Sequence, residues 1–182
     1  MQIDPATHLV EGAEYIPSPN MDDRPGGTDI NLLVIHSISL PPGEYGGSCI
    51  EQLFTNSLPP DAHPYFRQIH RLEVSAHVLI RRDGSLVQFV PFDKRAWHAG
   101  ESCYQGQHRC NDFSIGIELE GTDTDPFETA QYETLVELVN ALCQQYPSIT
   151  TQRIAGHSDI APGRKTDPGT GFDWNKLSTL LA

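Results

Sequence analysis

Basic residues are scarce in this sequence, and their scarcity limits the partners that the protein can bind. The 182 residues include 12 Lys and Arg against 24 Asp and Glu, which gives a formal net charge of -12. A nucleic-acid-binding surface needs clustered positive charge, and anionic lipid headgroups repel an acidic protein. We therefore expect neither a nucleic acid nor a membrane as partner. A small anionic ligand is still possible, because one or two local arginines can hold it.

Long apolar runs and paired cysteine motifs are also missing. No apolar stretch approaches the roughly 20 residues that a membrane-spanning helix needs. The segment Met1–Pro5 is not a basic stretch followed by an apolar one, as the start of a secretory signal would be. The four cysteines form no C-x-x-C pair and no zinc-ribbon spacing. Free thiols without an export signal fit a reducing compartment, so we expect a cytoplasmic protein.

The sequence does contain enough apolar residues for one well-buried core. No stretch has the composition of a linker, so residues 1–182 are predicted to form a single domain. Residues 1–29 are rich in proline, aspartate and glycine and predict an extended N-terminal arm with turns.

Apolar periodicity predicts strands and helices that alternate along this domain. Short β-branched or alternating runs predict strands at about 31–36, 76–81, 85–90, 112–120 and 153–155. The Asp-Gly pair between the second and third of these predicts a hairpin. Helical spacing predicts a long helix at about 128–146 and shorter ones at about 49–56 and 173–181. We therefore expect an α/β fold with a central mixed β-sheet flanked by helices.

Two segments carry side chains suited to binding a metal. His36 ends an apolar strand, where functional groups often sit, although a lone histidine there is more often structural. His157 and Asp167 lie ten positions apart in the loop 156–171, whose glycines and prolines should exclude helix and strand and aim both side chains at one point. Two imidazoles and a carboxylate, with water in the fourth position, make a catalytic zinc site. A simple surface turn is the alternative.

Glu118 lies on one face of the predicted strand 112–120, where small residues precede it. A carboxylate there could take a proton from an activated water and pass it to a leaving amine. Glu120 lies on the same face, so a solvated outer face explains the pattern equally well.

Several further aromatic residues and histidines could belong either to the site or to the structure around it. Trp97 could cover a sugar or a peptide, or belong to the core, and His98 is the main rival of His36 as a ligand. His77 alternates with apolar neighbours in a strand and is expected to be structural. His8 and His108 are expected to be exposed.

Several blocks of this sequence, in the same order, resemble the N-acetylmuramoyl-L-alanine amidases of the zinc amidase/peptidoglycan-recognition fold. The resemblance covers nearly the whole chain. Its blocks are Val34–His36, Ile38–Glu44, Ala62–Phe66, Val74–His77, Pro91–Gly100, Arg109–Phe113, Gly116–Asp123, Gly156–His157 and Arg164–Gly169. Two positions depart from the family pattern: Ser37 stands where asparagine is expected, and Glu73 where a basic residue is expected.

The resemblance implies a role for each candidate residue. It implies that one zinc ion is bound by His36, His157 and Asp167. It implies that Glu118 is the general base and later the acid, and that Lys165 stabilises the oxyanion. The expected substrate contacts are Arg109, Trp97 and His98.

The implied reaction is zinc-dependent hydrolysis of the amide between the lactyl group of N-acetylmuramic acid and L-alanine. The sequence looks most like the cytoplasmic members that act on 1,6-anhydromuramyl peptides released in cell-wall recycling, so the expected partner is an anhydromuropeptide. A non-catalytic peptidoglycan-binding module of the same fold and a zinc peptidase acting within the stem peptide are the alternatives.

Overall fold

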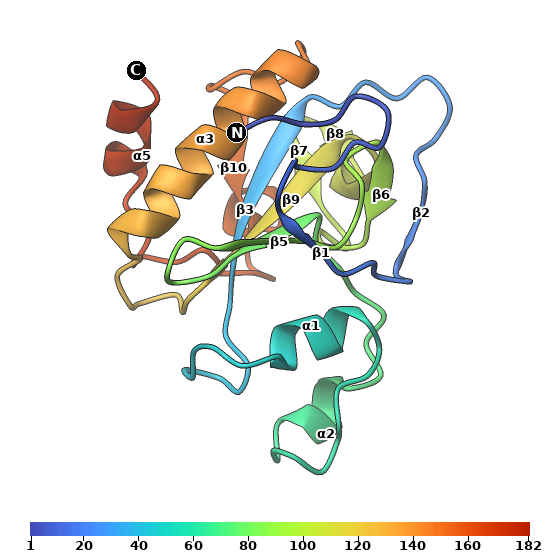
Figure 1. The fold of residues 1–182 in the computed structure, drawn as a ribbon, viewed down its shortest axis with the longest axis vertical. Coiled ribbons are helices and arrows are strands. Elements are labelled where there is room, and N and C mark those ends of the chain that lie inside the picture. Colours follow the sequence, from blue (N-terminus) through green and yellow to red (C-terminus); the bar gives the residue numbers. More distant parts are fainter.

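A computed structural model describes residues 1–182, and a six-stranded mixed β-sheet lies at its centre (Figure 1). In spatial order the strands are β1 (Glu14–Tyr15), β5 (Leu86–Gln88), β4 (Val78–Ile80), β9 (Ser114–Glu120), β3 (Leu32–Ile38) and β10 (Ile154–Gly156). Two small two-stranded sheets pair β2 (Met21–Asp23) with β6 (Lys94–Ala96), and β7 (Cys103–Tyr104) with β8 (Gln107–His108). The predicted α/β fold with a central mixed sheet is confirmed.

The central strands β3 and β9 run parallel, and their register decides which side chains meet. His36 lies opposite Glu118 in this pairing, and β10 pairs parallel to the other edge of β3. Strands β4 and β5 form the predicted antiparallel hairpin around Asp83 and Gly84. Residues paired in register point to the same side of a sheet. His36 and Glu118 therefore share one face although they are far apart in the sequence.

Helices cover the sheet, and so its central strands are buried on both faces, as parallel strands usually are. The long α3 (Thr129–Gln145) and the C-terminal α5 (Trp174–Leu180) share the largest apolar core with β3, β4 and β9. All seven residues of β9 are buried, including Glu118 at 9% and Glu120 at 2% exposure. The structure therefore excludes the solvated outer face that Glu120 had suggested.

Two short helices project below the sheet in the view of Figure 1. They are α1 (Cys49–Phe54) and α2 (Phe66–Ile69), in the segment 49–74 that connects β3 to β4. Phe54 and Phe66 pack with Leu79 and Phe89 in a second apolar core under the hairpin. This core attaches the segment 49–74 to the sheet and makes it a wall beside the strand ends.

The first 29 residues run largely as extended chain and turns along the rest of the domain. Val10 is buried in the main core, β1 adds to the edge of the sheet, and β2 pairs with β6. The guanidinium group of Arg24 donates hydrogen bonds to the backbone carbonyls of Phe92, Asn111, Asp112 and Ser114. No helix of the structure has both the length and the apolar character that crossing a membrane requires.

Two local predictions were wrong. The loop 156–171 begins with one turn of helix, α4 (His157–Ile160), because its prolines come later and the carboxylate of Asp159 accepts a hydrogen bond from the Gly156 N–H at 2.7 Å. His8, expected to be exposed, is half-buried, and its Nδ1 lies 2.7 Å from the hydroxyl of Tyr146.

Candidate metal centre and catalytic site

Three side chains that are distant in the sequence meet at one end of the central sheet. The Nδ1 atoms of His36 and His157 lie 3.0 Å apart, and Asp167 Oδ2 lies 3.1 Å from each of them. The side chains of both histidines are almost fully buried, while that of Asp167 is 15% exposed. The convergence on which the predicted zinc site depends is therefore present in the fold.

Strand pairing explains why these residues meet. Gly156, the last residue of β10, pairs with Ile35 in the parallel strand β3. The residues that follow this pair, His157 and His36, therefore lie together at the same end of the sheet. The chain then returns, because the Ser158 N–H donates a hydrogen bond to the Asp167 carbonyl at 2.9 Å. This bond places the Asp167 carboxylate beside the two imidazoles.

The three ligand atoms fit a zinc ion in spacing and chemistry. Zinc bonds of about 2.0–2.1 Å in a tetrahedron separate ligand atoms by about 3.3 Å, close to the 3.0–3.1 Å found here. Two imidazole nitrogens and a carboxylate oxygen suit zinc better than magnesium, which prefers oxygen throughout. These three residues form a group that can hold a metal ion.

The charge states of His36 and Asp167 at neutral pH are those that a metal needs. Burial lowers the pKa of His36 to about 4, so its imidazole is neutral. Burial acts to raise the pKa of Asp167, but its close contacts with the imidazoles of His157 and His36 outweigh burial and hold that pKa well below its usual range. Metals bind neutral imidazoles and ionised carboxylates, so few protons must leave when a metal enters.

Glu118 lies beside His36 on the neighbouring strand β9. Its Oε2 atom is buried and has no hydrogen-bond partner in the protein. Burial raises the pKa of this carboxyl well above its usual value, and the charge of Asp167 adds to the rise while that of Lys165 opposes it. A carboxyl group with a raised pKa and an unpaired oxygen is suited to taking up and releasing a proton during a reaction.

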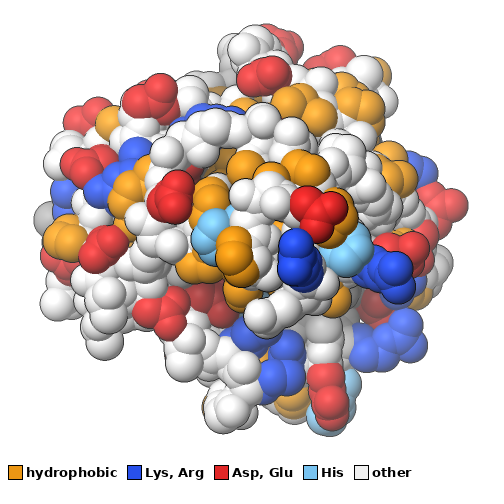
Figure 2. All heavy atoms as spheres, turned by 90° about the horizontal axis from the view of Figure 1, so that it is seen from below, with side chains coloured by type: hydrophobic (Ala, Val, Ile, Leu, Met, Phe, Trp, Pro, Cys, Tyr) orange, Lys and Arg blue, Asp and Glu red, His pale blue; other side chains and the backbone are white.

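A cavity of about 440 Å³ opens over these groups, a volume typical of a small-molecule site. His36, Glu118, His157, Lys165 and Asp167 all line it. Acidic and basic side chains are interspersed with hydrophobic ones on the face that Figure 2 shows from below. The cavity therefore combines a reactive polar end with space for a ligand.

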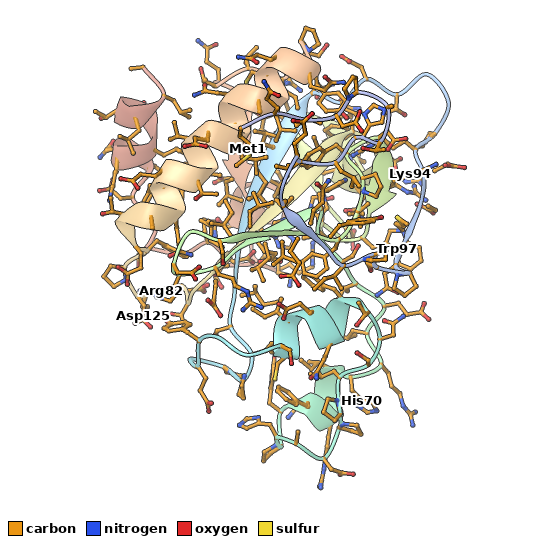
Figure 3. All side chains as sticks on the ribbon, in the orientation of Figure 1. Met1, His70, Arg82, Lys94, Trp97 and Asp125 are labelled. Atoms are coloured by element: carbon orange, nitrogen blue, oxygen red, sulfur yellow. The ribbon has the colours of Figure 1, made fainter.

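The opposite wall of the cavity is largely apolar, and sequence reasoning missed it. Six lining residues come from the segment 49–74: Leu53, Phe54, Tyr65, Ile69, Leu72 and Val74. Trp97, which is labelled in Figure 3, adds an aromatic ring to this lining. Helices as short as α1 and α2 show little periodicity, so only their common position in the fold reveals this wall.

The other predicted substrate contacts, and the two positions that depart from the family pattern, do not lie together. His98 lines the cavity. Arg109 does not line it: its side chain is 72% exposed and lies 3.3 Å from the carboxylate of Asp112. Ser37 Oγ donates to Asp123 Oδ1 at 3.3 Å, so this departure touches the cavity rim and not the metal-binding atoms. Glu73 is exposed.

Comparison with known proteins identifies the class to which this fold and site belong. Residues 26–170 match the family described as N-acetylmuramoyl-L-alanine amidase. The chain belongs to this family of hydrolases, as its sequence had indicated.

The chain is also similar to individual members of this family. The chain is 60% identical to the 1,6-anhydro-N-acetylmuramyl-L-alanine amidase AmpD of Enterobacter cloacae, over 93% of this chain and 90% of that protein. It superposes with a TM-score of 0.96 on a crystal structure of a selenomethionine derivative of AmpD, at 56% identity and with both chains fully covered. The structure of Escherichia coli AmiD with the substrate anhydro-N-acetylmuramic acid-L-Ala-D-γ-Glu-L-Lys is more distant, at 28% identity and a TM-score of 0.62 over 94% of this chain and 60% of that one.

Proposed function

We propose that this protein is a zinc-dependent amidase that cuts the bond between the lactyl group of 1,6-anhydro-N-acetylmuramic acid and L-alanine in muropeptides. The observation that carries this proposal is the meeting of His36, His157 and Asp167 beside Glu118 and Lys165 in one cavity. The anhydro form of the sugar is supported by the names of the AmpD relatives and by the substrate bound to AmiD. The four free cysteines agree with a cytoplasmic site of action in cell-wall recycling.

Each group has a task in this hydrolysis. Zinc, when bound by His36, His157 and Asp167, supplies a Lewis acid that lowers the pKa of water to about 7. Glu118 accepts a proton from the attacking water at its buried carboxylate and then delivers it to the alanine nitrogen as the C–N bond breaks. The net reaction adds one water, giving a carboxylic acid on the sugar and a free amine on the peptide. Lys165 places a positive charge where the carbonyl oxygen becomes negative.

The same arrangement suggests how a substrate is held. Trp97 and the apolar wall of segment 49–74 give the muropeptide a surface on which a sugar ring or a methyl group can pack. Arg109 is exposed, and its side chain lies 3.3 Å from the carboxylate of Asp112. We propose that it meets a carboxylate of the stem peptide outside the cavity.

Product analysis of a defined anhydromuropeptide tests the reaction. We expect free anhydromuramyl sugar and an intact peptide, no product after treatment with a chelator, and recovery when zinc is added back. Chromatography with mass detection distinguishes the alternatives. Cleavage inside the peptide would show a zinc peptidase, and binding without any product would show a peptidoglycan-binding module.

Replacement of Lys165 with alanine tests the oxyanion role. Lys165 is exposed, so the variant should fold and bind zinc normally. Its turnover number should fall by about 10²–10³, the usual effect of losing one group that stabilises a developing oxyanion. Lys176→Ala is a matched control, because Lys176 contacts Thr129 on α3 and does not line the cavity. Near-normal turnover of the Lys165 variant would remove this residue from the mechanism.

A further inference from the structure

We propose that His98 and Ala99 form a positioning segment that keeps a hydrogen on Nε2 of both metal-binding histidines, so that both Nδ1 lone pairs face the metal. The inference rests on the proposed function, because it concerns the same zinc site. In this proposal His98 acts through His36. The sequence had instead predicted that His98 contacts the substrate.

The hydrogen of the His157 ring is placed by a backbone carbonyl. Its Nε2 lies 3.1 Å from the carbonyl oxygen of Ala99. A carbonyl oxygen can only accept, so Nε2 must carry the hydrogen. A neutral imidazole has one such hydrogen, and Nδ1 of His157 is therefore a free acceptor. This is the atom that lies 3.0 Å from His36 Nδ1 and 3.1 Å from Asp167.

A hydrogen-bond path links His36 through His98 and Ser114 to a second backbone carbonyl. Ser114 Oγ donates to the Cys110 carbonyl oxygen at 2.6 Å, which uses the only hydrogen of the hydroxyl. Ser114 Oγ must therefore accept from His98 Nε2, 3.2 Å away. With its hydrogen on Nε2, His98 accepts at Nδ1 from His36 Nε2 at 2.9 Å. His36 Nδ1 is then left without a hydrogen, as metal binding requires.

The surrounding fold holds this segment in place. The backbone N–H groups of His98 and Ala99 both donate to Asn111 Oδ1, at 3.1 and 2.7 Å. Strand β9 makes room for the imidazole, because a Cβ atom on Gly116 would lie 2.5 Å from His98 Cγ. Both nitrogens of the His98 ring are already engaged by protein groups. These contacts fit a positioning residue better than a free substrate-binding group.

Zinc affinity of two His98 variants tests the proposal. His98→Phe keeps a ring of similar size but leaves His36 Nε2–H without an acceptor. We expect its zinc dissociation constant, measured by competition with a fluorescent chelator, to rise about 10- to 100-fold, as for other groups that orient metal ligands. In His98→Asn the side-chain oxygen can replace Nδ1 as acceptor, so affinity should return to within a few-fold of wild type. His108→Phe, at an exposed histidine, is the matched control and should bind zinc normally.

A direct measurement covers the case in which His98→Phe does not fold. ¹⁵N spectra of the histidine rings in the zinc-free wild-type protein should show the Nε2–H tautomer at His36, His157 and His98. An Nδ1–H tautomer at His36 or His157 would overturn the proposal, as would wild-type zinc affinity in a folded His98→Phe variant. If the proposed function were wrong, the wild-type protein itself would bind no zinc or release no sugar. That result differs from both outcomes that would overturn the role of His98.

Discussion

Replacing Glu118 with glutamine is expected to lower the turnover number by about 10²–10⁴, the usual contribution of a general acid–base group. Glutamine has nearly the same shape but cannot accept the proton of the attacking water or return it to the leaving amine. Glu118 contributes no atom to the group of metal-binding residues, so the zinc content should stay at the wild-type level. Single-turnover kinetics and elemental analysis of the same preparation measure the two quantities.

The control for this variant is Glu133→Gln, on an exposed position of α3, which should leave kcat and zinc content unchanged. If Glu118→Gln loses its zinc, Glu118 is a ligand or supports one. If the variant turns over at the normal rate, another group moves the proton.

The raised pKa of Glu118 also affects stability in the zinc-free protein. The folded state binds this proton more tightly than the unfolded state, whose carboxyl has a pKa near 4.5. Stability linked to Glu118 is therefore complete below pH 4.5 and is lost as the pH rises through the folded-state pKa. With chelator present, Glu118→Gln should be more stable than wild type at neutral pH, and the difference should shrink toward pH 4.5. Urea denaturation at several pH values measures it.

Replacing Asp167 with alanine is expected to abolish activity at zinc concentrations that saturate the wild-type protein. Asp167 provides the only negative charge among the three metal-binding residues, and its carboxylate lies 3.1 Å from both imidazoles. Zinc affinity should fall by more than the 10- to 100-fold typical of groups that only orient ligands. Chelator competition and the zinc dependence of product release would measure the loss.

Asp61→Ala is the matched control for this experiment. Asp61 is exposed and pairs with Arg67 in the segment 49–74, away from the metal-binding residues. Its zinc affinity should equal that of wild type. Full zinc occupancy of Asp167→Ala at wild-type affinity would mean that the metal is held by other residues, and the proposed centre would have to be abandoned.

Local patterns were enough to predict the long elements of the fold but not the short ones. Strand β3 is a continuous apolar run, the Asp-Gly pair marks the hairpin of β4 and β5, and helix α3 buries one face with the helical period, so the sequence alone shows them. Strands of two residues, such as β1, β7 and β8, have no measurable period and are defined only by their partners. Helix α4 was missed because the prolines that follow it dominate the composition of the loop.

For the site, the sequence indicated the residues but not the reason that they meet. Spacing alone could not bring His36 to His157, because their contact depends on the pairing of β3 with β10 across more than 100 residues. Alternation in β9 showed which side chains share a face with Glu118, but it could not show that this face is buried. The hydrogen-bond path from His98 to Ser114 ends on a backbone carbonyl, for which a sequence carries no signal.

The division of the cavity between two parts of the chain has a practical consequence. One continuous segment, residues 49–74, supplies most of the apolar wall, whereas the proposed hydrolytic groups lie on strands β3 and β9 and in the loop 156–171. Ligand preference can therefore be re-engineered by exchanging or randomising that piece alone, with the hydrolytic groups left untouched. Substitutions confined to residues 49–74 are therefore expected to change which ligands the cavity accepts.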